Sequence, residues 1–333
     1  MHDIKQQYYA HGKLLLTAEY FVLCGAKAIA LPLRYGQRMD VSEGGPDGML
    51  RWNAFMQGHL WFSCGFSLPD FEIVHSTDPE KAAVLQNIFG AIMKMDPKFG
   101  IGKAREIHTH LDFNHQWGLG SSSTLIANLA KWAGVEAFHL NEMIFNGSGF
   151  DIACATADGP VFYRKGHLSE PVSLEYPFSD HLYFIYSGSK KDTRNEIHRF
   201  LNGGSIPGQA ISHMNELSEQ MAQAQELTEF QRLISEHERL VSGLLHVPPV
   251  KQERFPGFEG EVKSLGAWGG DFYLAVSALD DPYVRGYFSR KGLEVVFPWK
   301  ALVLERLRAD RTQQGKQAPV APEPVLLNRV DYE

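Results

Sequence analysis

The chain has 333 residues, of which 44% are hydrophobic and 21% are charged, and its formal net charge is -7. This composition is typical of a globular protein that is long enough for two domains. The pI near 6.1 argues against a nucleic-acid-binding protein, because such proteins usually carry a basic patch and have a high pI.

Nothing in the sequence predicts secretion or membrane insertion. The first ten residues are polar and lack the apolar core of a signal peptide, and no apolar stretch is long enough to span a bilayer. Cys24, Cys64 and Cys154 are odd in number and widely spaced, which favours reduced thiols over a disulfide framework or a zinc site. We therefore expect a cytoplasmic protein with no membrane partner.

Apolar runs predict strands in the first third of the chain. Two strands joined by a tight turn are expected within residues 12–33, and a hairpin that turns at Gln57 and Gly58 is expected within residues 48–66. The alternation over residues 106–113 predicts a further strand.

Two helices are predicted around these strands. The first has Thr77 as its N-cap, Pro79 in its first turn and Glu80 three residues after the cap. The second contains small apolar residues over residues 125–133 and follows a glycine-rich loop.

In the second half of the chain, predicted strands alternate with predicted helices. Strands are predicted within residues 160–187 and over residues 272–276, and helices within residues 205–245. Residues 309–325 are rich in Gln, Ala and Pro and predict a loose tail or a long loop.

The glycine-rich loop spans residues 117–123 and reads WGLGSSS. A strand, a glycine loop, hydroxyl residues and a helix form a good phosphate cradle, because glycines allow close backbone approach and a helix N-terminus favours negative charge. The loop is neither a Walker A motif nor a dinucleotide fingerprint. Taken alone, a loop of this kind is more often a plain connection.

Three other segments strengthen the phosphate-binding interpretation. They are residues 11–20 (HGKLLLTAEY), residues 147–153 (GSGFDIA) and residues 264–271 (SLGAWGGD). Together with the loop, in this order and at this spacing, they resemble the motifs of the GHMP kinase family over nearly the whole chain.

Within that family the motifs look most like those of phosphomevalonate kinases, with mevalonate kinases as the nearest alternative. Residues 187–194 (SGSKKDTR) also resemble the substrate segment of phosphomevalonate kinases. The sequence departs from the family at His11, where proline is usual, and at Ala18 and Trp268, where glycine is usual. None of these departures removes a charged catalytic group.

The resemblance implies catalytic roles for two residues. Asp151 would take the proton of the attacking acceptor, although a plain turn aspartate is the other reading of its position. Lys13 would orient Asp151 or stabilise charge on the transferred group. The implied ATP-binding residues are Gly118, Leu119, Gly120, Ser121, Ser122 and Ser123.

The resemblance also implies sites for magnesium and for the acceptor. Ser122 would face the magnesium ion, and Glu142 is a candidate carboxylate ligand, with a solvated helix glutamate as the alternative. The implied substrate-binding residues are Ser148, Gly149, Lys190, Thr193, Arg194, Gly266 and Gly269. Arginine and lysine suit an acceptor that carries carboxylate or phosphate.

The fold implied by the resemblance is the α+β GHMP kinase fold. An N-terminal domain of the ribosomal protein S5 domain 2-like type would cover residues 1–170 and hold the nucleotide. A C-terminal ferredoxin-like domain would cover residues 171–333, with the loose tail starting near residue 309.

The implied reaction is transfer of the γ-phosphoryl group of Mg²⁺-bound ATP to a small acidic acceptor, with phosphomevalonate as the first choice. Mevalonate or a sugar is the alternative acceptor, and a catalytically inactive metabolite-binding regulator is the alternative of another class. We expect no nucleic-acid partner, and a monomer or a homodimer.

Overall fold

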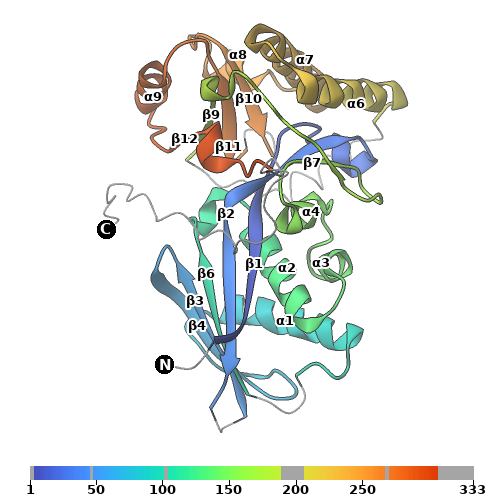
Figure 1. Ribbon diagram of the computed structural model, residues 1–333, viewed down its shortest axis with the longest axis vertical. Coiled ribbons are helices and arrows are strands. Elements are labelled where there is room, and N and C mark those ends of the chain that lie inside the picture. Colours follow the sequence, from blue (N-terminus) through green and yellow to red (C-terminus); the bar gives the residue numbers. More distant parts are fainter. Residues whose placement is uncertain (1–3, 46–47, 101–103, 189–205, 267–269, 307–333) are drawn as a thin grey trace, which may run out of the picture.

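The computed structural model describes residues 4–45, 48–100, 104–188, 206–266 and 270–306. These residues form two lobes stacked along the long axis of the molecule, each built around one β-sheet (Figure 1). Within this described part, no helix is both long and apolar enough to cross a membrane.

The first lobe contains an 8-stranded sheet with the order β5-β4-β3-β6-β2-β7-β8, and β1 pairs with β2 beside this path. Its strands are β1 (Ile4–Leu15), β2 (Ala28–Glu43), β3 (Met49–Met56), β4 (His59–Ser67), β5 (Ile73–Ser76), β6 (Arg105–Leu111), β7 (Val161–Tyr163) and β8 (Glu170–Pro171). Neighbouring strands are antiparallel, except that β3 and β6 are parallel.

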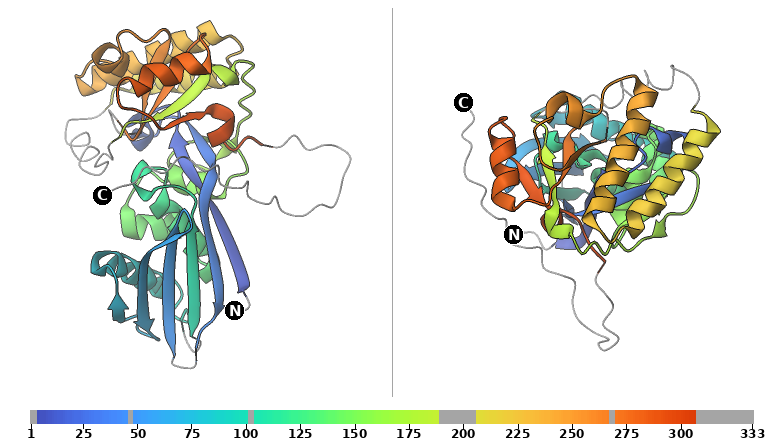
Figure 2. Two further views of the ribbon diagram at one scale, coloured as in Figure 1. Left: turned by 90° about the vertical axis from the view of Figure 1, so that its left-hand side faces the viewer. Right: turned by 90° about the horizontal axis from the view of Figure 1, so that it is seen from above.

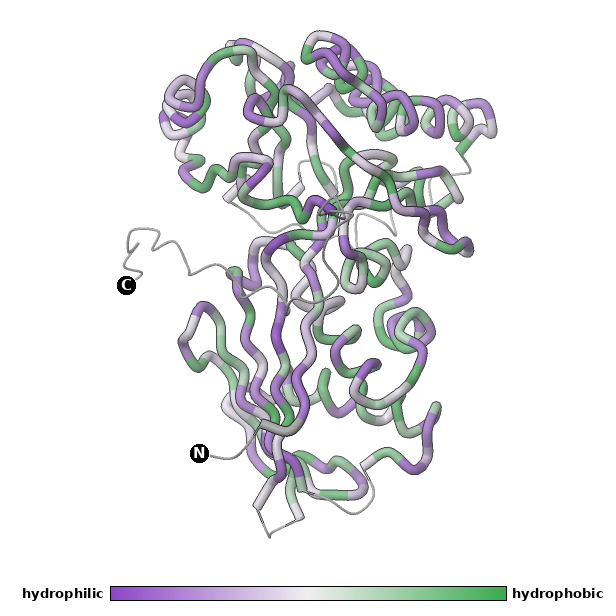
Figure 3. The backbone as a smooth tube through the Cα atoms, viewed as in Figure 1, coloured by the Kyte–Doolittle hydropathy of each residue, from purple (hydrophilic) through white to green (hydrophobic). Residues whose placement is uncertain are grey.

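Four helices cover one face of this sheet (Figure 1). They are α1 (Pro79–Met95), α2 (Ser121–Ala133), α3 (Ala137–Phe145) and α4 (Phe150–Thr156). Buried residues alternate along β6, and hydrophilic and hydrophobic residues alternate along the long strands in Figure 3. This period of two is the pattern of a sheet with one face packed against helices.

The predicted strands and the predicted hairpin of this lobe are confirmed, although the strands begin and end at other residues than expected. The strands expected within residues 12–33 are β1 and β2, but β1 starts at Ile4 and β2 continues to Glu43, where it pairs with β6. The hairpin is confirmed, with Gln57 at φ 49° and Gly58 at φ 84° in its two-residue turn.

The predicted cap of α1 is wrong by one residue. The N-cap is Asp78, whose carboxylate accepts a hydrogen bond from the Lys81 backbone N–H at 3.1 Å, and Pro79 occupies the first turn. The Thr77 hydroxyl is engaged elsewhere, because it contacts the backbone N–H and carbonyl of Ser63.

The second lobe contains a 4-stranded antiparallel sheet with the order β10-β11-β9-β12. Its elements are 3-10 helix η3 (Ser179–His181), β9 (Leu182–Tyr186), α6 (Gly208–Gln223), α7 (Leu227–Leu245), α8 (Val250–Arg254), β10 (Glu261–Leu265), β11 (Phe272–Val276), α9 (Asp281–Ser289), β12 (Val296–Pro298) and α10 (Trp299–Leu302). A strand, helices, two strands, a helix and a strand form the ferredoxin-like arrangement. Figure 2 shows α6 and α7 together at the end of the molecule farthest from the first sheet.

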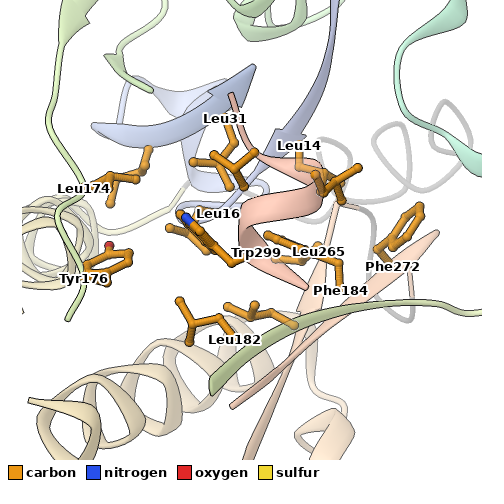
Figure 4. Packing of buried hydrophobic residues seen from close by; sticks show 14 of the residues in the cluster. Leu14, Leu16, Leu31, Leu174, Tyr176, Leu182, Phe184, Leu265, Phe272 and Trp299 are labelled. Carbon is orange, nitrogen blue, oxygen red and sulfur yellow. The ribbon is translucent and has the colours of Figure 1, made fainter. Parts of the chain in front are cut away.

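One hydrophobic core joins the two lobes. Leu14, Leu16 and Leu31 from the first sheet belong to the same buried cluster as Phe184 and Trp299 from the second lobe (Figure 4). The chain also returns to the first lobe after α10, where Leu33 forms an isolated bridge with Val303. The relative position of the lobes is therefore fixed by buried apolar contacts, which stabilise by about 25 cal/mol per Å² of buried apolar surface.

Candidate active site

The glycine loop forms an open helix N-terminus. Gly118 and Gly120 have φ angles of 68° and 97°, and Gly120 is the N-cap of α2. No side chain caps this helix, and the first-turn N–H groups of a helix have no intrahelical acceptor. The loop therefore presents backbone donors and the positive end of the helix dipole, an arrangement that binds anions.

The predicted loop residues have different environments. Ser122 is exposed and Ser121 is half-buried, so their hydroxyl groups are the accessible ones. Ser123 is buried, and its hydroxyl donates to the Gly120 carbonyl at 2.9 Å. Leu119 is buried, and its carbonyl accepts a hydrogen bond from the Lys13 backbone N–H at 2.9 Å.

Lys13 lies on β1 directly beside this loop. A Cβ atom added to Gly120 would lie 2.9 Å from the Lys13 Cγ, and one added to Gly12 would lie 2.8 Å from the Leu119 carbonyl oxygen. The Lys13 Nζ lies 5.4 Å from the centroid of the Phe150 ring. The lysine that the sequence singles out therefore lies between the glycine loop and the start of α4.

Asp151 occupies the first turn of α4, next to Phe150. Burial raises the pKa of its carboxyl group, and the Lys13 charge opposes that shift. This opposing effect shows that the two groups are within electrostatic reach of each other. A carboxylate with a raised pKa beside a fixed ammonium group is suited to accept a proton.

Cys154 lies one turn after Asp151 and is fully buried. Burial and the Asp151 charge both raise the pKa of its thiol. The thiol is therefore protonated at neutral pH and is no candidate nucleophile.

Residues of the two later motifs lie close to the start of α4 and to the glycine loop. The Ser148 carbonyl accepts a hydrogen bond from the Tyr163 hydroxyl at 2.5 Å, and Gly149 is the N-cap of α4 with φ 90°. A Cβ atom added to Gly118 would overlap the Asp271 side chain. The last motif therefore packs directly on the glycine loop, although its resemblance to the family implied no separate role for Asp271.

The first motif is attached to the second lobe through a buried polar cluster. Glu19 forms an ion pair with Lys263. Burial raises the pKa of the Glu19 carboxyl group, and the Lys263 charge and the backbone N–H of Gly266 oppose that shift. The Ala18 backbone N–H donates to His237 Nε2 at 2.9 Å. Sequence reasoning missed Lys263 and His237, because both stand among other polar residues of their elements and nothing in the sequence marks them as buried.

Ala18 has a left-handed φ of 64°. This conformation explains why glycine is expected there, since the left-handed region is unfavourable for residues with a Cβ atom. The hydrogen bond to His237 holds the alanine in this conformation.

Of the remaining predicted positions, several lie outside the described residues and one is exposed. Lys190, Thr193, Arg194, Gly269 and Trp268 lie outside the described residues. Glu142 is exposed on α3. Among the described residues, no group of three or more His, Cys, Asp or Glu side chains is placed to hold a metal ion.

Comparison with known proteins identified similar proteins by structure alone. No protein-family model and no curated protein sequence matches the chain. The mevalonate kinase of Methanococcus jannaschii superposes with a TM-score of 0.64 at 13% identity, covering 89% of this chain and 97% of that chain.

Two other solved structures are similar to a comparable degree. The Streptococcus pneumoniae phosphomevalonate kinase, solved with phosphomevalonate and AMPPNP, has a TM-score of 0.63 and 15% identity, covering 88% of this chain and 99% of that chain. The Lactococcus lactis galactokinase, solved with galactose, has a TM-score of 0.61 and 14% identity, covering 89% of this chain and 93% of that chain. The chain therefore has the α+β fold of the GHMP kinases.

Proposed function

We propose that this protein is an ATP-dependent small-molecule kinase of the GHMP type, with phosphomevalonate as its acceptor. The observation that carries the proposal is the convergence of the uncapped α2 N-terminus, Lys13 and Asp151 at one place in this fold. These groups supply an anion cradle, a fixed cation and a base, which are the parts that phosphoryl transfer requires.

The first step of the proposed mechanism is a proton transfer to the protein. The acidic P–OH group of the phosphomevalonate phosphate gives its proton to the Asp151 carboxylate as the same phosphate oxygen forms a bond to the γ-phosphorus, so that the product carries a diphosphate. The bond between that phosphorus and the β,γ-bridging oxygen breaks, and ADP leaves with the electron pair. Lys13 stabilises the negative charge that accumulates near the acceptor oxygen and keeps Asp151 oriented.

The residues at the loop fit the phosphates of ATP. The backbone N–H groups of the first turn of α2 are uncapped, and the Ser122 hydroxyl is exposed beside them. A magnesium ion needs few protein ligands, so one hydroxyl and one carboxylate would suffice, and we propose Ser122 and Glu142 for these roles. When bound, the ion neutralises charge on the transferred group.

The identity of the acceptor is the most specific part of the proposal. We propose Ser148, Gly149 and Gly266 as acceptor contacts, since Ser148 and Gly149 directly precede α4 and the Gly266 backbone N–H faces Glu19 of the first motif. Lys190, Thr193 and Arg194 are proposed to hold the carboxylate and the phosphate of phosphomevalonate. One structural neighbour was solved with phosphomevalonate and an ATP analogue, which supports this choice of acceptor.

The test is a measurement of ADP release with ATP and Mg²⁺ across phosphomevalonate, mevalonate and galactose. We expect turnover with phosphomevalonate, and a loss of at least 10³-fold in Asp151→Ala because the base is removed. The rate should fall on the acid side at a pH above the usual aspartate pKa of about 4, since protonated Asp151 cannot accept a proton.

The outcomes separate the alternatives. Turnover with mevalonate or galactose alone keeps the kinase and overturns phosphomevalonate as the acceptor. Wild-type ADP release that is no faster than that of Asp151→Ala overturns catalysis by Asp151, and the absence of ADP release with every acceptor leaves the regulator interpretation.

A further inference from the structure

The turn that carries Asp151 is tied to the first sheet by one tyrosine. Tyr163 lies at the end of β7, where it pairs with Ala28 of β2. Its side chain is 3% exposed, and its hydroxyl donates a hydrogen bond of 2.5 Å to the Ser148 carbonyl. The sheet is a rigid support, whereas the turn at residues 146–149 connects two short helices.

The same turn is packed closely against the tyrosine. Gly149 has φ 90°, and a Cβ atom added to it would lie 2.7 Å from the Tyr163 hydroxyl oxygen and 3.3 Å from the Phe138 ring. The Gly149 carbonyl accepts hydrogen bonds from the N–H groups of Ile152 and Ala153, both at 3.1 Å. The position of Gly149 therefore determines where the first turn of α4 begins, and Asp151 lies in that turn.

The electrostatics agree with this geometry. Burial and the charge of Asp151 together raise the pKa of Tyr163 to about 12. The phenol is therefore protonated at neutral pH and acts as a hydrogen-bond donor. Because it is almost inaccessible and its hydroxyl is already bonded to a backbone carbonyl, it does not contact the substrate.

We propose that Tyr163 is a positioning residue, which fixes the Ser148–Gly149 turn and thereby places the Asp151 carboxylate relative to Lys13. The kinetic part of this inference rests on the proposed kinase function. Tyr163 has no part in ATP binding under this proposal, since the phosphate cradle is at α2 and the tyrosine contacts the turn before α4.

The test uses Tyr163→Phe, which keeps the ring and removes only the hydroxyl. Tyr176→Phe is a matched control, because Tyr176 is also buried and its hydroxyl also donates to a backbone carbonyl, that of Met221 at 2.8 Å. We expect a similar loss of stability in both variants. Only Tyr163→Phe should lower kcat with phosphomevalonate, by about tenfold or more, while the KM for ATP stays within about twofold.

Three kinetic results would overturn the inference. One is an unchanged kcat in Tyr163→Phe, and another is an equal fall in kcat in both variants, which would reflect stability alone. A rise in the KM for ATP without a change in kcat would also contradict it, because the tyrosine would then act on nucleotide binding.

Hydrogen exchange separates this inference from the kinase proposal, because it needs no turnover. The backbone amides of Ile152 and Ala153 bond to Gly149, so a loosened turn should exchange them about tenfold faster in Tyr163→Phe and not in Tyr176→Phe. If wild type transfers phosphate to no acceptor, the kinase proposal fails, and this measurement still decides the structural inference. Unchanged exchange in Tyr163→Phe would overturn it.

Discussion

At the scale of single residues, the glycine loop depends on positions that have no room for a side chain. Gly118 needs both a left-handed backbone and space against Asp271. Gly120 needs a left-handed backbone and lies against Lys13 and Ser123. The two glycines therefore couple the conformation of the anion cradle to the residues that surround it.

Gly118→Ala tests this coupling. We expect the proposed phosphate transfer to fall by at least 10²-fold in kcat/KM, because the added methyl group displaces Asp271 or the loop. The free energy of unfolding should fall by about 1–3 kcal/mol, from the left-handed strain and the overlap.

Gly134→Ala is the matched control at the other end of the same helix. Gly134 is the C-cap of α2 with φ 71°, and an added Cβ atom would meet nothing within 4 Å. It should cost about 1 kcal/mol of stability from backbone strain alone and leave ADP release unchanged. Equal losses of activity in the two variants would show that strain, and not the contact with Asp271, controls the loop.

At the scale of elements, local sequence and structure agree closely. The β3–β4 hairpin turns at Gln57 and Gly58, both with positive φ, which is the combination found in the two-residue turns that match the twist of paired strands. Gly58 suits this turn, whereas Gln57 does not, since asparagine is much more frequent than glutamine at such a φ.

Gln57→Asn should therefore stabilise the protein. Gln57 is exposed, so the substitution changes the turn without disturbing the core, and we expect a gain of about 0.5 kcal/mol in the free energy of urea-induced unfolding. Gly58→Ala should lose about 1 kcal/mol, because alanine disfavours φ 84°. A loss of stability in Gln57→Asn would contradict the assignment of a left-handed residue at this position.

At the scale of the whole molecule, a buried polar cluster lies where the lobes meet. Glu19 from the first lobe contacts Lys263 of β10 and lies 3.3 Å from His237 Nε2 of α7. Because the Ala18 N–H already donates to Nε2, that nitrogen accepts, and burial together with the Lys263 charge keeps the pKa of His237 well below its usual value. The histidine is therefore neutral.

Glu238, the residue after His237, belongs to the same cluster. Burial raises its pKa to about 8, against the opposing Lys263 charge and with an added contribution from the Glu19 charge, so it is protonated in the folded protein at neutral pH. In the unfolded chain it ionises near its ordinary value of 4.5. The folded state therefore holds one more proton than the unfolded state between about pH 4.5 and pH 8.

This difference makes stability depend on pH in a definite direction. The contribution of Glu238 is fully present below pH 4.5 and is lost as the pH rises through about 8. Glu238→Gln should remove that dependence, so the variant should exceed wild type in the free energy of unfolding at pH 8 by on the order of a few kcal/mol. At pH 4.5 the two proteins should be nearly equal.

Urea unfolding at both pH values measures the difference, with Glu236→Gln as the control. Glu236 lies on the same helix, is half-buried, and pairs with His213 and Arg232. Its substitution should not raise stability at pH 8. If wild type and Glu238→Gln show the same pH dependence, Glu238 is ionised in the folded protein.

The sequence by itself determined the local structure and the residues of the proposed chemistry. Periodicity and turn residues predicted the β3–β4 hairpin, β6, α2, α7 and β11, because these depend on neighbours within a few residues. The motifs selected Lys13, Asp151 and the glycine loop, and the structure places them together. The cap of α1 was predicted one residue early, since Thr77 and Asp78 are both suitable caps and the contact of Thr77 with Ser63 decided between them.

Only the tertiary structure decided which distant groups meet. Lys263 contacts Glu19 across 244 positions of the chain, and Asp271 packs on Gly118. Tyr163 supports the turn before Asp151 through a backbone carbonyl, an acceptor that every residue possesses and that leaves no mark in the sequence. Such contacts depend on the docking of two sheets through a shared apolar core, and burial of charged groups is favourable only where that docking supplies their partners.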